Sequence, residues 1–227
     1  MNQKGIFKNV VVKKYIMGLS GLFLILFLLV HLSINLCALI PDGGNTFNEL
    51  AEFMDLPVIK PLEVGLFIGF IIHILDALVL TLQNRKARKN GYEVSAANAN
   101  SKWYSRSMGI LGTLLLMFLI IHLAHFWFPN RFTGYELDGK ESHNLYQLML
   151  YTFNELWIVV LYVLVQISLG YHLLHGFRSA FQTLGLNHPR YNTIIEGLGV
   201  IYSITVPLLF AVIPVILYLR IHGYIPY

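Results

Sequence analysis

Five long runs of apolar residues, separated by shorter polar stretches, dominate the pattern of the chain. A helix rises about 1.5 Å per residue, so roughly 20 apolar residues are needed to cross the hydrocarbon core of a bilayer. Backbone groups in lipid must be paired within their own segment, which favours helices over open strands. We therefore expect an all-α, single-domain integral membrane bundle with five transmembrane helices, at about 15–40, 62–82, 107–128, 156–177 and 197–219. The connections, 41–61, 83–106 and 129–155, are expected to be loops.

The positions of the charged residues predict how the bundle is oriented in the membrane. These residues make up only 12% of the chain. If the N-terminus is cytoplasmic and the C-terminus lies outside, 12 of the 16 Lys and Arg residues face the cytoplasm, as basic loop residues usually do. The net charge of +4 then reflects topology beside an anionic lipid leaflet, and we expect no nucleic-acid partner.

Histidine is the residue type that brings chemistry into the apolar runs. Six of the nine histidines lie there: His31, His73, His122, His125, His172 and His175. Ionisable groups at membrane depth are costly, so they usually face the bundle interior and serve a cofactor or a proton relay. One such histidine could simply hydrogen-bond a neighbouring helix, but four of the five predicted helices carry at least one.

The depth of each histidine in the membrane follows from its distance to the end of its helix. His31 and His122 are expected roughly 9–14 Å below the outer edge, and His73 and His172 roughly 8–14 Å from the cytoplasmic edge. Two facing imidazoles can ligate a haem iron from both sides, and bundle cores commonly hold such cofactors. The sequence thus predicts two stacked b haems, an outer one on His31/His122 and an inner one on His73/His172.

The sequence allows more than one role for His125, His175 and Asp76. His125 and His175 lie one turn beyond proposed ligands and nearer a membrane face, where they could contact a haem propionate or a quinone, or could be plain interfacial residues. Zinc at the pairs His122/His125 and His172/His175 is a weaker alternative, because no Asp or Glu completes a zinc-type set there. Asp76, one turn after His73, could face a proton pathway or pair with a basic residue at the inner surface.

Short motifs in these helices resemble those of a known membrane family. The first helix contains Ser20–Leu24 (SGLFL) before His31, and the fourth contains Tyr171–Arg178 (YHLLHGFR). Their order is similar to that in cytochrome b membrane-anchor subunits of the succinate dehydrogenase / fumarate reductase (succinate:quinone oxidoreductase) family, of the single-chain, five-helix, two-haem type. The resemblance covers nearly the whole chain.

This resemblance implies a division of labour between subunits in a bacterial cytoplasmic (inner) membrane. A flavoprotein subunit would interconvert succinate and fumarate, an iron–sulfur subunit would relay electrons, and this chain would anchor both and exchange electrons with quinone, by resemblance menaquinone. The resemblance places His73 and His172 at the haem nearer the iron–sulfur subunit. It also suggests Arg178 as a propionate partner, with Ser20, Arg106 and His175 as further cofactor contacts.

A quinone site needs a pocket near a haem edge, a hydrogen-bonding group and a route for protons. The outer half of the predicted bundle offers Asn35, Glu49, Glu52, Glu63 and His125. The three glutamates could equally be solvated loop charges. Docking of the partner subunits could use the basic residues at the cytoplasmic ends, namely Lys13, Lys14, Arg85, Lys86, Arg88 and Lys89, although topology explains these equally well.

Two other functions remain open at this point. A haem-free transporter could use the same histidines as a proton relay, although no inverted repeat or broken helix is visible. A cytochrome b serving another dehydrogenase, such as a hydrogenase, would share the ligands and differ only in its partner. The Gly176 and Arg178 spacing favours the succinate/fumarate family.

Overall fold

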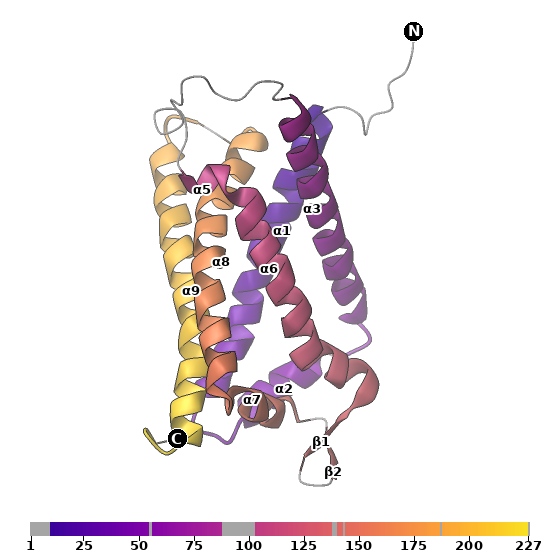
Figure 1. Ribbon diagram of the computed structural model, residues 1–227, viewed down its shortest axis with the longest axis vertical. Helices are drawn as coiled ribbons and strands as arrows, with labels where there is room; N and C mark the ends of the chain where they lie inside the picture. Colours follow the sequence, from indigo (N-terminus) through magenta and orange to yellow (C-terminus); the bar gives the residue numbers. More distant parts are fainter. Residues whose placement is uncertain are drawn as a thin grey trace.

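Five long helices form the body of the protein in the computed structural model, which describes residues 10–54, 56–87, 103–137, 140–142, 144–186 and 188–226. They are α1 (Val10–Leu36), α3 (Lys60–Ala87), α6 (Met108–His122), α8 (Leu156–Thr183) and α9 (Asn192–Ile221). Each forms or contributes to a helical segment that is long and apolar enough to cross a bilayer, so five helices of the predicted kind are confirmed. The helices alternate in direction (Figure 1), and α1 begins at one end of the bundle, the N-end, whereas α9 finishes at the other, the C-end.

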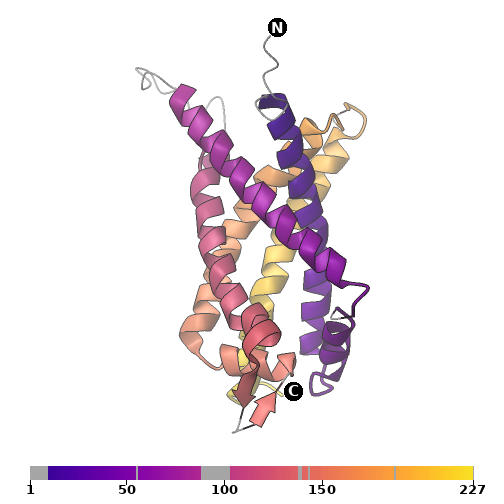
Figure 2. The ribbon, with the colours of Figure 1, turned by 90° about the vertical axis from the view of Figure 1, so that its right-hand side faces the viewer.

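The helices differ in how far they enter the packed interior. α8 and α9 lie against each other, α1 contacts α3, α8 and α9, and α6 lies along α8. α3 crosses α1 obliquely (Figure 2), and none of its described side chains is fully buried. Gly69 lies at that crossing, where a Cβ would lie 2.9 Å from Cε1 of the Phe23 side chain. α9 carries no candidate ligand, yet buried residues recur along it from Gly199 to Leu217.

Two short helices cover the C-end where only loops were expected. They are α2 (Asn45–Met54) and α7 (Leu145–Phe153). Asn48 joins them: its amide donates to Asn144 Oδ1 at 2.9 Å, and its own Oδ1 accepts from the Tyr146 backbone N at 3.1 Å. Asn144 also caps α7 by accepting from the Gln147 backbone N. Both helices are too short to register as membrane spans, which is why the apolar pattern did not reveal them.

The turn that leads into α2 is organised by Asp42. Its carboxylate accepts hydrogen bonds from the hydroxyl and the backbone N of Thr46 and from the backbone N of Gly44. The Thr46 hydroxyl, followed by its backbone N, lowers the pKa of Asp42. Gly44 has a φ of +84° and lies against Tyr146, whose Cγ would be 2.1 Å from a Cβ at this position. Only glycine fits between this turn and α7.

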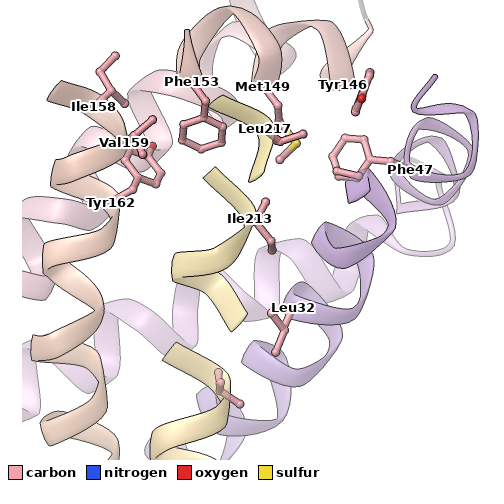
Figure 3. Packing of buried hydrophobic residues seen from close by; sticks show 12 residues of the cluster. Leu32, Phe47, Tyr146, Met149, Phe153, Ile158, Val159, Tyr162, Ile213 and Leu217 are labelled. Atoms are coloured by element: carbon pink, nitrogen blue, oxygen red, sulfur yellow. The ribbon is translucent and has the colours of Figure 1, made fainter. Parts of the chain in front are cut away.

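A cluster of buried apolar side chains lies where α2 and α7 pack against the long helices (Figure 3). It joins α1, α2, α7, α8 and α9 through residues that include Leu32, Phe47, Met149, Tyr162 and Leu217. The two short helices are therefore part of the core and fix the C-end of the bundle.

The polypeptide continues beyond α6 in an unusual conformation. Two π-helical segments follow, η3 (Leu123–Trp127) and η4 (Pro129–Thr133). The chain leaves them at Gly134, with φ +60°, and enters a hairpin of β1 (Tyr135–Leu137) and β2 (Lys140–Ser142). The short helix α5 (Trp103–Arg106) precedes α6, and a 3₁₀ turn, η2 (Cys37–Leu39), extends α1. A π turn contains more residues than an α turn, and it often marks a functional site.

Charged residues of the described part separate between the two ends. Most basic ones lie toward the N-end: Lys13, Lys14, Arg106, Arg178 and Arg190. Most acidic ones lie toward the C-end: Asp42, Glu49, Glu52, Glu63 and Glu155. This separation underlies the predicted cytoplasmic N-end, and the side of the membrane stays a prediction. Of the suggested docking residues, Arg88 and Lys89 lie outside the described residues.

Candidate functional site

The four predicted ligands form two pairs of imidazole rings, and each pair joins two helices. His31 of α1 and His122 of α6 make the C-end pair, with ring centres 5.7 Å apart and planes at 87°. His73 of α3 and His172 of α8 make the N-end pair, with ring centres 6.3 Å apart and planes at 67°. These are the partners that depth along the helices predicted.

The spacing within each pair suits two imidazoles on opposite sides of one metal ion. A ring nitrogen lies about 2 Å from a metal that it binds and the ring centre about 1 Å further, so two such centres are about 6 Å apart. All four rings are half-buried. The pairs therefore have the reach that axial ligation of a haem iron requires.

No family model, curated protein or solved structure matches the chain. The chemistry of the site therefore rests on its own geometry. Within the described ranges, no group of three or more His, Cys, Asp or Glu side chains converges as a metal site. A structural zinc site needs four such ligands, so histidines that meet two at a time do not favour one.

The N-end pair is bordered by small residues of neighbouring helices. Ser20 Oγ on α1 lies 3.1 Å from His73 Nδ1. A Cβ at Gly21 would lie 3.5 Å from Cε1 of His73, and one at Gly112 of α6 would lie 3.8 Å from Cε1 of His172. Nδ1 of His172 is buried without a hydrogen-bond partner. Four helices thus contribute to the surroundings of this pair.

The C-end pair is bordered by aromatic rings instead. His31 stacks on Phe27, with centres 5.3 Å apart, and lies 5.7 Å from Phe210 of α9. His122 stacks on Phe118, with centres 5.7 Å apart, and its Nδ1 is buried without a hydrogen-bond partner. Such rings exclude water and offer flat apolar surfaces to a flat macrocycle.

His125 is bound to a different partner, Tyr162 of α8. Its Nδ1 lies 3.0 Å from the Tyr162 hydroxyl oxygen, and the two rings stack with planes at 10°. The π-helical segment η3 carries His125 further round the helix from His122 than an α turn would. Tyr162 is only 5% exposed, and a buried hydroxyl needs a hydrogen-bond partner. The sequence alone gave no sign of Tyr162.

The remaining cofactor-contact candidates lie toward the N-end of the bundle. Arg178 pairs with Glu196 of α9 at 3.1 Å, and both side chains are at least half exposed. Arg106 is exposed at the end of α5, and His175 is half-buried one turn beyond His172. Asp76, which was expected at a proton pathway or beside a basic residue, has one carboxylate oxygen, Oδ2, that is buried without a hydrogen-bond partner.

The five quinone-site candidates are not gathered in one place. Asn35 donates to the His31 carbonyl at 2.7 Å, and His125 is bound to Tyr162. Glu49 and Glu52 are exposed on α2. Glu63 alone of the five lines an open hollow, of about 380 Å³, between α3 and the π-helical segments.

Two residues that the sequence analysis missed hold Glu63 in that hollow. Trp127 Nε1 donates to Glu63 Oε1 at 2.8 Å, and Arg131 forms an ion pair with Oε2. Apolar side chains, including Val64, Phe67 and Phe132, line the rest of the hollow. Arg131 falls in a segment expected to be a loop, so its helical spacing from Trp127 was not anticipated.

Proposed function

We propose that the chain is the di-haem cytochrome b membrane anchor of a succinate:quinone or quinol:fumarate oxidoreductase. In this role it passes electrons between an iron–sulfur subunit and membrane quinone. The observation that carries the proposal is the arrangement of four histidines in two ring pairs, each drawn from two helices of one bundle. The order of the SGLFL and YHLLHGFR motifs supports this particular family.

The residues of both pairs fit haem ligation. His31 and His122 would hold one haem, and His73 and His172 the other. Nδ1 of His122 and Nδ1 of His172 are buried without a hydrogen-bond partner, and iron ligation through that nitrogen would satisfy it. When bound, haem iron supplies reversible one-electron transfer.

The task of the chain itself is to hold these rings, keep water out and fix the distance between the two levels. Ser20, which contacts the N-end pair, and His31, in the C-end pair, both lie on α1. Their separation in the sequence corresponds to about 16 Å along the helix axis. One continuous helix therefore sets the spacing of the two sites.

The charge distribution supports different partners at the two ends. Most described basic side chains lie toward the N-end, which in this proposal faces the cytoplasm. The flavoprotein and iron–sulfur subunits dock there, and complementary charge would assist their docking. Quinone, by resemblance menaquinone, then exchanges electrons at the C-end.

Glu63 is the quinone-site candidate with the best geometric support. Its carboxylate is oriented by Trp127 and Arg131 at the edge of an apolar hollow, and such a pocket suits a quinone ring with polar carbonyls. A carboxylate at hydrogen-bonding distance can accept a proton from quinol or deliver one to quinone.

Replacing Glu63 by glutamine is expected to lower quinone-linked turnover of the purified complex about 100-fold, because the amide cannot exchange the proton. The measurement is quinone-linked succinate oxidation or fumarate reduction, alongside haem content and succinate oxidation with an artificial acceptor, both of which should be unchanged. Glu49→Gln, on the exposed face of α2, is the matched control and should behave as wild type. An equal loss of quinone-linked turnover in both variants would show that Glu63 is not part of the quinone site.

The proposed function is tested first by a reduced-minus-oxidised spectrum with haem quantification on the purified chain. We expect two low-spin b haems per chain, and reduction of haem by succinate in the purified complex. A chain that binds no haem when produced with haem available overturns the proposal and returns the histidines to proton relay. If the haem is reduced through a different co-purifying dehydrogenase and is not reduced by succinate, the chain belongs to another complex.

A further inference from the structure

Ser20 makes a hydrogen-bond connection between the N-end pair and the backbone of α1. Its Oγ donates to the Met17 carbonyl at 3.2 Å and lies 3.1 Å from His73 Nδ1. A serine hydroxyl has one hydrogen, and within a helix it commonly goes to a carbonyl one turn earlier. With the Ser20 hydrogen directed to the Met17 carbonyl, the Ser20 oxygen accepts and Nδ1–H of His73 is the donor.

That assignment determines which nitrogen of His73 is available to a metal. A neutral imidazole has one N–H and one lone pair, so an Nδ1–H leaves the lone pair on Nε2. The ring also rests on α1 beside Ser20, because Cε1 of His73 lies 3.5 Å from the ideal Cβ position of Gly21, which is an ordinary packing distance. The His73 ring thus packs against α1, and its Nδ1 is held by Ser20.

The other three histidines lack an equivalent hydroxyl acceptor among the described residues. Nδ1 of His122 and of His172 is buried without a partner. Nδ1 of His31 has only the Asn35 amide nitrogen at 3.4 Å, and that amide donates to the His31 carbonyl at the shorter distance of 2.7 Å. The Ser20 contact therefore distinguishes one of the four proposed ligands.

We propose that Ser20 is a positioning residue that fixes the tautomer of His73 and tunes the electron affinity of the haem that His73 ligates. This inference rests on the proposed function, because it requires a haem at the N-end pair. An acceptor for Nδ1–H makes the ring a stronger electron donor through Nε2, which stabilises ferric over ferrous iron. Loss of that acceptor shifts the balance towards the ferrous form.

Potentiometric titration of both haems, with low-spin electron paramagnetic resonance spectra, tests the inference in Ser20→Ala. We expect the ferrous-to-ferric ratio of one haem to rise on the order of tenfold at a fixed ambient potential, which corresponds to a midpoint about 59 mV higher. The affected haem should be the one that His73→Ala removes. The other haem should keep its potential and its spectrum.

Two variants separate this role from general packing. Ser20→Thr retains the hydroxyl and should titrate as wild type. Ser33→Ala removes another α1 hydroxyl, which donates to the Leu29 carbonyl on an exposed face, and should change neither haem. A selective shift or selective loss of the His73 haem in Ser20→Ala, restored by threonine, supports the inference.

Other outcomes overturn it. If both haems bind but Ser20→Ala changes neither, changes both equally or is matched by Ser20→Thr, Ser20 has no positioning role and the proposed function stands. If the wild-type chain binds no haem, both fail, and the haem count shows this before any titration.

Discussion

Replacing His122 by alanine is expected to leave the purified chain with one low-spin haem instead of two. The variant removes one of the two nitrogens of the C-end pair, and His31 would then be surrounded mainly by aromatic carbon. Alanine offers no replacement ligand. The haem-to-protein ratio and the reduced-minus-oxidised spectrum measure the loss, and the N-end haem should keep its spectrum.

His125→Ala is the matched control, because His125, in η3, follows His122 along the same helical span. It should retain both haems, since His125 is bound to Tyr162 and is in neither pair. We expect a loss of about 1–3 kcal/mol in the free energy of unfolding, because the buried Tyr162 hydroxyl loses its partner. A low-spin haem lost from His125→Ala but kept in His122→Ala would show that the ligand assignment is wrong.

Replacing Gly44 by alanine is expected to destabilise the C-end of the bundle by roughly 3 kcal/mol or more. The new Cβ would overlap the Tyr146 ring, whose Cγ is 2.1 Å away, and the backbone φ of +84° disfavours any side chain. Relief would require α7 to move away from the turn before α2. Thermal and denaturant unfolding in detergent measure the loss.

Gly43→Ala separates the two contributions. Gly43 also has a positive φ, +72°, but nothing lies within 4 Å of its ideal Cβ position. It should therefore lose only the conformational part, about 1–2 kcal/mol. Equal destabilisation by the two variants would show that the contact between Gly44 and Tyr146 is unimportant for packing.

The spans and the histidine partners could be predicted because both depend on position along a helix. A bilayer requires about 20 apolar residues in each span, and the rise per residue converts sequence position into depth. His31 and His122 were assigned to one level and His73 and His172 to the other, and the rings meet in those combinations. Haem ligation itself stays a prediction.

Contacts that depend on the rotation of a helix about its axis could not be predicted. A helix that is apolar on all sides gives little signal about which face turns inward. Ser20 contacts His73, 53 positions away, and His125 contacts Tyr162, 37 positions away. Neither contact can be inferred from the residues that neighbour it in the sequence. Arg178 was expected near a propionate by resemblance, yet Glu196 of α9 lies beside it.

Because of the order of the four histidines along the chain, neither pair can form within one half of the bundle. One pair comes from α1 and α6 and the other from α3 and α8, so the two pairs interleave. Two consecutive spans never contain a complete pair. Severing the chain between α3 and α6 would leave each fragment with one ring from each pair, and only their reassociation would restore either.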